Sequence, residues 1–392
     1  MNRLATRTEL FGSCITRQSS LHTTAVGGIN LAQGFPEANP ASSVVKASVE
    51  ATLNGRNQYA DMRGLAELRE AVPRHRCEWL GGSSYSPESE VTITCGATEA
   101  MIASLLATID VGDEVLLQAP SYENYRPQVI LAGGIPRFFR LAGSGNRLDV
   151  AAIDSMCSNR TKAVILNNPN NPTGRVFDSG ELDGLAELCC RRDLYLLLDE
   201  VYEHLVWDRR PFISLAGLPG MRERTVVISS LSKTWAATGW RVGWALAPSD
   251  ITAGIRRCHD FLTGCAPTAA QIGAVQAMSL NREYYDLQTA DYESRRTLLG
   301  ECLRECGIDV RSPEGTYYFF ADVRPLGYED SSVFAKELLQ QAGVGVVPWQ
   351  AFFDDDRPEN RVWARLNFAK ARSTLEQAAD RLLAFARNRA RG

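Results

Sequence analysis

The chain has 392 residues, 45% of them apolar, and a formal net charge of −4. This length exceeds a single ordinary core, so two domains are expected, and the apolar fraction is sufficient to fill both. The small negative charge, without a basic cluster interleaved with aromatic residues, argues against nucleic acid as the main partner. Because no apolar run approaches the roughly 18 residues that span a bilayer, a soluble globular protein without a membrane segment is expected.

The ten cysteines are scattered through the expected helices and strands. Since no signal-peptide stretch is seen, they are expected to be reduced thiols in a cytoplasmic protein. Two close pairs, Cys189 with Cys190 and Cys302 with Cys306, could suggest metal ligands. None of the four histidines has zinc-like spacing to a cysteine, however, so no metal site is expected.

The first 28 residues are rich in Ser, Thr and Arg and contain one acid, a composition similar to that of an organelle transit peptide. Since Ile29 follows too closely for a long removable leader, we expect these residues to belong to the folded protein. From about Pro40 to Arg76 the pattern is helical, with a turn at Asn57–Tyr59.

Apolar runs of strand length then alternate with helical stretches. They lie near residues 91–95, 114–118, 135–139, 163–167, 194–199 and 225–229. This alternation predicts a mainly parallel sheet with helices on both faces, whose ligands gather outside the carboxyl ends of the strands.

The C-terminal third of the chain has a different pattern. A long amphipathic stretch from about Ala269 to Cys306 is predicted to link the large domain to a smaller one. Strands are expected there at Tyr317–Asp322 and Val344–Val347, and a last helix at about 373–390.

Three of the strands end in residues that suit a cofactor. Gly96, Ala97 and Thr98 form a glycine turn and helix start, whose free amide groups bind phosphate. Further along, Asn171 lies in a turn rich in Asn, Pro and Gly that presents its side-chain amide. The next strand ends in Asp199, with Tyr202 three residues later, so an acid and a phenol emerge together.

A fourth strand is followed by Ser229–Arg241, which reads Ser-Ser-Leu-Ser-Lys-Thr-Trp-Ala-Ala-Thr-Gly-Trp-Arg. Lys233, in this small-residue turn, is well placed to form an imine with an aldehyde cofactor, and Arg241 can hold a phosphate. A Ser-x-x-Lys spacing also occurs in serine acyltransferases of the penicillin-binding type and at many helix starts. The prediction therefore depends on the four strand ends together.

Four such sites in this order, ending with a lysine, resemble the fold-type I pyridoxal 5'-phosphate (PLP) enzymes, specifically the class I/II aminotransferases, over nearly the whole chain. The segments Ile29–Glu37, Asn57–Ala60, Asn170–Gly174 and Arg365–Lys370 are most similar to the kynurenine, glutamine and methionine aminotransferase branch. The resemblance implies an α/β fold with a mainly parallel seven-stranded sheet flanked by helices, plus a smaller α+β domain.

The resemblance also implies a division of the chain. Its parts are an N-terminal arm and part of the small domain (1–44), a large PLP-binding domain (45–280) and a C-terminal small domain (281–392). The arm is expected to pack over the active site and a partner subunit of a homodimer.

The resemblance gives each candidate a role toward the cofactor. Lys233 is expected to bind PLP and to move the proton between the substrate Cα and the cofactor C4′. Asp199 should pair with the protonated pyridine nitrogen, and Tyr202 and Asn171 should hydrogen-bond the phenolic oxygen. Tyr122 matches the aromatic residue that stacks on the ring. The phosphate is expected among Gly96, Ala97, Thr98, Ser230, Arg241 and, from the partner subunit, Tyr59.

On the substrate side, Arg365 should hold the α-carboxylate, a task suited to its planar pair of donors. Gly34 should allow the backbone to approach the substrate closely, and Tyr125 and Asn171 are expected nearby. Trp349 departs from the small residue expected in this branch. His204 is assigned no role, because a lone histidine is more often hydrogen-bonded structure.

The predicted function is transfer of an α-amino group from an amino acid to a 2-oxo acid. Since no clear second arginine is seen for a side-chain carboxylate, the donor is expected to be neutral, aromatic, sulfur-containing or polar. One alternative is a PLP-dependent lyase or cyclase acting on a modified amino acid, such as a hydroxyarginine, because these enzymes share every residue named. A non-catalytic regulator is disfavoured, since 28 residues before Ile29 are too few for a helix-turn-helix module.

Overall fold

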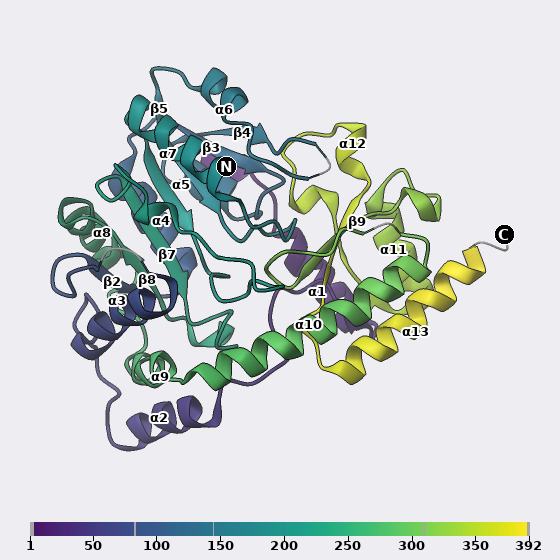
Figure 1. Cartoon of the computed structure of the whole chain (residues 1–392), viewed down its shortest axis with the longest axis horizontal. Helices are drawn as coiled ribbons and strands as arrows, with labels where there is room; N and C mark the ends of the chain where they lie inside the picture. Colours follow the sequence, from purple (N-terminus) through teal and green to yellow (C-terminus); the bar gives the residue numbers. More distant parts are fainter. Residues whose placement is uncertain (1–3, 82–83, 144, 309, 390–392) are drawn as a thin grey trace.

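The computed structural model describes residues 4–81, 84–143, 145–308 and 310–389. Its centre is a seven-stranded sheet in the order β2-β8-β7-β6-β5-β3-β4 (Figure 1). The strands are β2 (Val91–Thr94), β3 (Glu114–Ala119), β4 (Ile135–Arg140), β5 (Thr161–Asn167), β6 (Tyr195–Asp199), β7 (Thr225–Ser230) and β8 (Gly243–Leu246). Only β8 runs antiparallel to its neighbours in this sheet. The predicted α/β class and mainly parallel sheet are confirmed.

The six strands predicted from apolar runs are all present, whereas β8 was not among them. It has four residues and follows the lysine loop directly, so its sequence offers little more than a short apolar run. It lies between β2 and β7, which are far apart in sequence.

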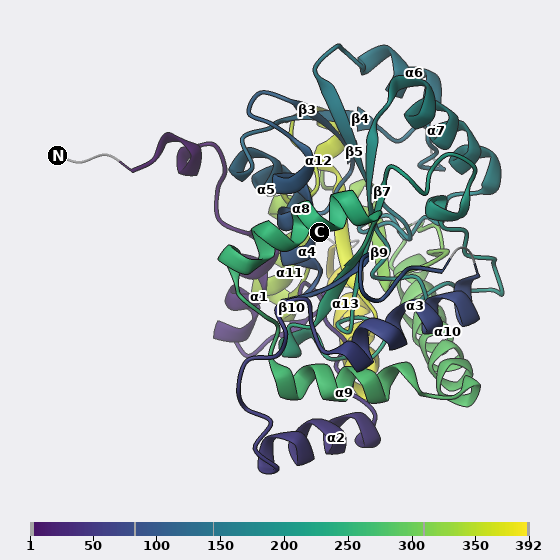
Figure 2. The same cartoon turned by 90° about the vertical axis from the view of Figure 1, so that its left-hand side faces the viewer.

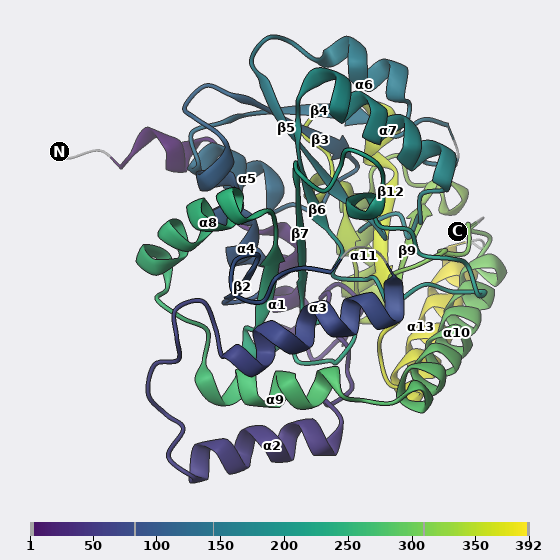
Figure 3. The same ribbon diagram turned by 60° about the vertical axis from the view of Figure 1, so that its left-hand side comes forward.

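Helices cover both faces of this sheet (Figure 3). One face carries α4 (Ala97–Thr108), α5 (Tyr125–Leu131) and α8 (Ser249–Leu262). The other carries α3 (Ala66–Leu80), α6 (Val150–Met156), α7 (Ser179–Arg192) and α9 (Thr268–Met278), with α2 (Ser42–Leu53) packed on α9. Leu196 and Leu198 enter the second of these cores and Leu197 the first, because successive strand residues point to opposite faces. A strand buried on both faces is apolar throughout, as the sequence is here.

The C-terminal part is a smaller α+β layer beside the sheet. An antiparallel sheet has the order β11-β12-β9, and a parallel pair joins β1 to β10. These strands are β1 (Ile29–Asn30), β9 (Tyr318–Asp322), β10 (Val344–Gly345), β11 (Val347–Pro348) and β12 (Trp363–Asn367). The helices are α10 (Arg282–Glu305), α11 (Ser331–Ala342), α12 (Pro358–Arg361) and α13 (Arg372–Arg389), and α10 lies along α13 (Figure 1).

The N-terminal segment contains η1 (Thr6–Glu9) and α1 (Ile15–Ala25). In Figure 2, η1 stands away from the body of the molecule, and all four of its residues are exposed. Through β1 the same segment joins the C-terminal layer. The remaining short helices are η2 (Leu215–Gly217), η3 (Thr238–Trp240), η4 (Arg324–Leu326) and η5 (Trp349–Ala351).

Three expected elements differ in detail. The stretch from Ala269 to Cys306 is two helices, because α9 ends at Met278 and the side chain of Asn281 caps a new helix by accepting from Tyr284 N. The expected strand Val344–Val347 is divided between β10 and β11, which belong to different sheets. The last helix ends at Arg389, and residue 390 of the prediction lies outside the described residues. Among the described helices, none is long and apolar enough to cross a membrane.

Candidate active site

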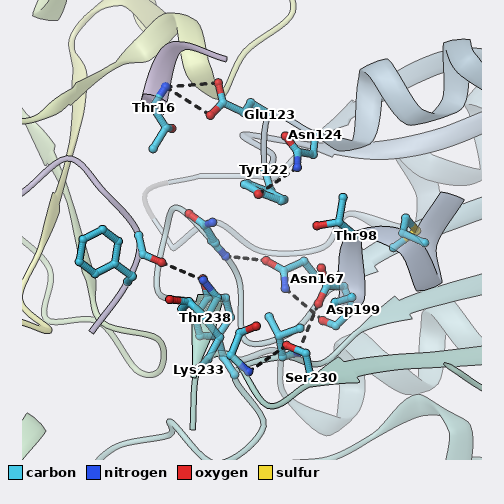
Figure 4. A pocket seen from close by; sticks show the side chains of 18 of the residues that line it. Thr16, Thr98, Tyr122, Glu123, Asn124, Asn167, Asp199, Ser230, Lys233 and Thr238 are labelled. Carbon is cyan, nitrogen blue, oxygen red and sulfur yellow. Dashed lines mark hydrogen bonds between the residues drawn. The ribbon is translucent and has the colours of Figure 1, made fainter. Parts of the chain in front are cut away.

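A cavity of about 580 Å³ lies where β5, β6 and β7 end, between the large sheet and the C-terminal layer (Figure 4). Most residues predicted for the site line it: Gly34, Ala97, Thr98, Tyr122, Tyr125, Asn171, Asp199, Tyr202, Ser230, Lys233, Arg241 and Arg365. Gly96 does not line the cavity itself but caps the helix that does. Tyr59 lies outside it and is 91% exposed.

Lys233 follows β7 and points into the cavity (Figure 4). Its Nζ donates to the Gly34 carbonyl oxygen at 2.8 Å and lies about 6 Å from the ring centres of Tyr202 and Tyr317. Desolvation of the amine lowers the pKa of Lys233 below its usual value. A lysine with a lowered pKa is more often unprotonated, and the unprotonated amine is the nucleophile.

Asp199 is the last residue of β6. Its carboxylate accepts from the Tyr125 hydroxyl at 2.6 Å and from Val201 N at 3.3 Å. Burial raises the pKa of this carboxyl above its usual value. A cation placed beside it would remove this cost, so the site suits a positively charged partner. Tyr125, predicted for the substrate side, lies at the start of α5 and is bonded to Asp199 instead of standing free.

The start of α4 forms the wall at the other end of the cavity. Gly96 has a φ of +80°, and a Cβ at this position would contact the guanidinium of Arg241. Its carbonyl oxygen accepts from Glu99 N at 3.2 Å, so the N–H groups of Ala97 and Thr98 precede the first bonded amide of the helix. Arg241 donates to Thr238 O at 2.9 Å and remains exposed. Free amides, a helix N-terminus and a guanidinium form a cradle that fits a phosphate.

Arg365 lies in the middle of β12 with 1% of its surface exposed. It donates to Asn171 Oδ1 at 2.8 Å and to Ala32 O at 2.9 Å. Its Nε–H is buried and has no hydrogen-bond partner among the described residues. A buried guanidinium without a carboxylate partner is costly, so this position suits an anionic ligand.

Several lining residues were not predicted. Tyr318 comes from β9, and Cys14, Thr16 and Arg17 come from the start of α1. Glu123 fixes α1 there by accepting from Ile15 N at 2.8 Å and from Thr16 N at 3.3 Å (Figure 4). Local sequence patterns carry no signal for these individual contacts, because each depends on packing between segments more than 100 residues apart.

Two residues left without a role lie away from the cavity. His204 is buried in a ring cluster, 5.0 Å from His75, 5.8 Å from Trp235 and 5.0 Å from Tyr285 between ring centres. Burial lowers the pKa of His204 well below its usual value, so the ring is neutral structure. Trp349 donates through Nε1 to Asp330 Oδ1 at 3.2 Å. Within the described residues, no group of three His, Cys, Asp or Glu side chains could hold a metal ion.

The family model for aminotransferase class I and II matches residues 26–382. The chain belongs to this family. Its members depend on PLP, and the chain is a PLP-dependent aminotransferase. The residues described above fit this cofactor, because a carboxylate, an amine and a phosphate cradle face one cavity.

Similarity to individual proteins supports the same assignment. A probable N-succinyldiaminopimelate aminotransferase of Mycobacterium tuberculosis is 37% identical over 385 residues, covering 96% of this chain and 97% of the relative. The methionine aminotransferase of Escherichia coli is 35% identical over 371 residues, 95% of each chain. The solved structure of the mycobacterial N-succinyldiaminopimelate aminotransferase has a TM-score of 0.94 at 36% identity and covers 98% of this chain and 100% of that one. These similarities do not favour the lyase or cyclase alternative.

Proposed function

We propose that this aminotransferase uses the cavity bounded by Lys233, Asp199 and Arg365 to move an α-amino group from an amino acid to a 2-oxo acid. The observation that carries the proposal is that an amine, a buried carboxylate and a buried guanidinium face the same 580 Å³ space. PLP, when bound, supplies an electron-withdrawing ring that stabilises negative charge at the substrate Cα.

Lys233 is the proposed catalytic residue. With PLP bound, its Nζ would serve as general base toward the substrate Cα and then as general acid toward the cofactor C4′. The lowered pKa of Lys233 supports this task, because it increases the fraction of the amine that is unprotonated and able to accept a proton. Its present contact with Gly34 O is one that a substrate can replace.

Five further residues are proposed to hold the ring. Asp199 would form an ion pair with the protonated pyridine nitrogen, and Tyr125 orients that carboxylate by donating a hydrogen bond to it. Tyr202 and Asn171 donate to the phenolic oxygen. Tyr122 covers a ring face, and its position in the cavity wall supports this role.

The phosphate and the substrate carboxylate are assigned to opposite ends of the cavity. Gly96, Ala97, Thr98, Ser230 and Arg241 hold the phosphate, as the helix start and the exposed guanidinium suggest. Arg365 holds the α-carboxylate. Asn171 orients the guanidinium of Arg365 by accepting a hydrogen bond from it, and Gly34, without a side chain, leaves room for the substrate.

The donor is proposed to be a neutral, aromatic, sulfur-containing or polar amino acid. Aromatic rings in the cavity wall support this class, namely Phe35, Tyr122 and Tyr318. The name of the relative from Escherichia coli points to a sulfur-containing donor, and that of the mycobacterial relative to a longer one. Arg17, exposed at the cavity wall, is a candidate partner for an acidic substrate side chain that the sequence did not reveal.

The enzyme is also proposed to be a homodimer in which Tyr59 reaches the phosphate of the partner's site. Apolar side chains are exposed on the segment that carries Tyr59 and on α8: Phe261 is 94% exposed, Leu262 44% and Met62 43%. His259 Nε2 lies 2.8 Å from Met62 O, so these two segments are in contact. An apolar surface of this kind suits an interface between subunits.

The remaining assignments concern organisation and setting. We assign residues 1–44 to the arm and part of the small domain, 45–280 to the large domain and 281–392 to the small domain. Separate apolar clusters in the sheet and in the C-terminal layer support this division. A role in cytoplasmic amino-acid metabolism or biosynthesis is consistent with the activity.

A single-turnover experiment tests the proposal. Purified holoenzyme is mixed with each amino acid in turn, without a 2-oxo acid, and its absorbance and products are recorded. Conversion of the cofactor to its stable amine form, with release of one 2-oxo acid per site, is expected for the donor. Release of ammonia or of a cyclised product, with the original absorbance regained, would reject amino transfer.

A further inference from the structure

Two phenols meet beside Lys233. Tyr202 follows β6, and Tyr318 is the first residue of β9; their hydroxyl oxygens are 3.1 Å apart. Both side chains are buried, with 2% and 1% of their surface exposed. Tyr202 has a proposed task at the cofactor, whereas none of the roles given above requires the hydroxyl of Tyr318.

The ring of Tyr318 touches a second functional residue. The guanidinium carbon of Arg365 lies 4.2 Å from the centre of this ring and 5.2 Å from that of Phe352. A guanidinium held against aromatic faces keeps its plane and therefore its direction of donation. The antiparallel pairing of β9 with β12, which sets Tyr318 opposite Asn367, fixes this contact.

Either phenol can donate in this contact, so its direction depends on where Tyr202 gives its own proton. Burial raises the pKa of Tyr202 well above its usual value, so the hydroxyl keeps its one proton. If Tyr202 gives that proton to the cofactor oxygen, then Tyr318 is the donor in the contact between them. A hydroxyl that accepts a hydrogen bond becomes a stronger donor, because bonds in a chain polarise one another.

We propose that Tyr318 is a positioning residue with two actions: its hydroxyl donates to Tyr202 and commits the Tyr202 proton to the cofactor's phenolic oxygen, and its ring seats Arg365. The inference rests on the proposed function of Tyr202. It also gives a reason for glycine at position 34, because a Cβ there would contact the Tyr318 hydroxyl.

The charged groups that face Tyr202 are Asp199 at the end of the preceding strand β6, Lys233 after β7 and Arg365 on β12. Variants at position 318 leave all three in place. A hydrogen bond to the phenolic oxygen stabilises its negative charge and so favours the unprotonated form of the lysine-bound cofactor. Weakening that bond therefore raises the pH at which the bound cofactor changes colour.

The test is an absorbance titration of the holoenzyme in four forms: wild type, Tyr318→Phe, Tyr202→Phe and the double variant. Tyr318→Phe is expected to raise the apparent pKa of the bound cofactor by about 0.3 pH unit or more. Tyr202→Phe is expected to raise it further, and the double variant to equal Tyr202→Phe, because Tyr318 acts through Tyr202. Tyr292→Phe removes a buried phenol that stacks on Tyr317 but does not line the cavity, and it should leave the titration unchanged.

Steady-state kinetics test the second action. Tyr318→Phe keeps the ring against Arg365, so KM for the amino acid should stay within about twofold. Tyr318→Leu removes the ring, and KM should rise about tenfold while the cofactor stays bound. An unchanged KM in Tyr318→Leu would show that the ring does not seat Arg365.

The outcomes separate this inference from the function on which it rests. A shift in Tyr202→Phe without one in Tyr318→Phe, or fully additive shifts in the double variant, would overturn the role of Tyr318 and leave that of Tyr202 standing. No shift in Tyr202→Phe would reject the proposed role of Tyr202 itself. The Phe variants preserve packing, so the titration does not depend on the less conservative Leu variant folding.

Discussion

The two ends of the cavity differ in how completely one chain builds them. At the ring end, Asp199, Tyr125 and Arg365 are buried; Tyr125 donates a hydrogen bond to Asp199, and Arg365 donates one to Asn171. At the phosphate end, Thr98 and Arg241 are exposed, and Tyr59 lies outside the cavity. Charges act more strongly where water is excluded. The ring end is therefore enclosed by side chains of one chain, whereas the phosphate end is open to solvent.

The largest effect is expected from Lys233→Ala, because Lys233 is the residue proposed both to bind the cofactor and to move the substrate proton. Turnover should fall by about 10³-fold or more, and borohydride reduction of the variant should no longer fix the cofactor to the protein. The chain has only five lysines, at positions 46, 162, 233, 336 and 370, so peptide mapping of the reduced wild type is decisive.

Lys370 is the other lysine that the cofactor could label in this experiment. It is buried against Phe35, and burial lowers its pKa to about 8, so its amine is also reactive near neutral pH. It does not line the cavity. A label on Lys370 instead of Lys233 would show that the wrong amine has been assigned.

Asp199→Asn should have the next largest effect, because it removes the negative charge from the driest end of the cavity. Breaking a buried ion pair costs about 3–5 kcal/mol, which corresponds to a loss in kcat of roughly 10²- to 10⁴-fold. The measurement is kcat at saturating PLP, with the exposed Asp183→Asn on α7 as the control. If kcat stays within a few-fold, the ring nitrogen does not need this carboxylate.

Arg365→Lys tests whether the two ends of the cavity are independent. Lysine keeps the charge but loses the planar pair of donors, so kcat/KM should fall about 10- to 100-fold while the affinity for PLP is retained. Substrate saturation and cofactor titration are measured on the same preparation. Equal losses in both would mean that Arg365 supports the whole cavity and not the substrate carboxylate.

The sequence was sufficient for the ring end because its residues are local to strand ends. Parallel strands bring their carboxyl ends to one edge, so Asn171, Asp199 and Lys233 could be grouped without knowing the packing. Tyr318, which also lines this end of the cavity, was not predicted as a site residue. It was recognised as part of a strand, but only the docking of the C-terminal layer brings its hydroxyl to Tyr202.

The phosphate end was less predictable for a related reason. Gly96 and Arg241 could be predicted from local sequence patterns. Strand β8, which places Gly243 against the start of α4, is recognised only from the order of strands in the folded sheet. The contact of Glu123 with α1 joins segments that no local pattern connects. The role of Tyr59 involves a second copy of the chain and stays a prediction.

A smaller effect is expected from Glu203→Gln, a buried residue that does not line the cavity, and this variant measures how dry the protein interior around it is. Burial raises the pKa of Glu203 to about 8, against 4.5 in the unfolded chain. Between these values the folded state holds a proton that the unfolded chain has released, so stability is lost as pH rises toward 8. In the wild type this lowers the free energy of unfolding by up to about 1.4 kcal/mol per pH unit, and the variant should lose this pH dependence. Urea unfolding at pH 6 and pH 8 tests this, with the exposed Glu187→Gln as the control; an unchanged slope would show that Glu203 is hydrated.

The smallest effect is expected from Tyr59→Phe, which acts on the open end. Losing one hydroxyl donor to a phosphate should weaken PLP binding about tenfold without changing kcat at saturation. Cofactor titration by fluorescence gives the dissociation constant, and sedimentation shows whether the variant remains a dimer.

Mixing subunits carrying Tyr59→Ala with subunits carrying Lys233→Ala should restore tight binding at one site per hybrid, because that site combines an intact Lys233 with an intact tyrosine from the other chain. If hybrids show no recovery, Tyr59 acts within its own subunit or not at all, and the phosphate end is closed by other means.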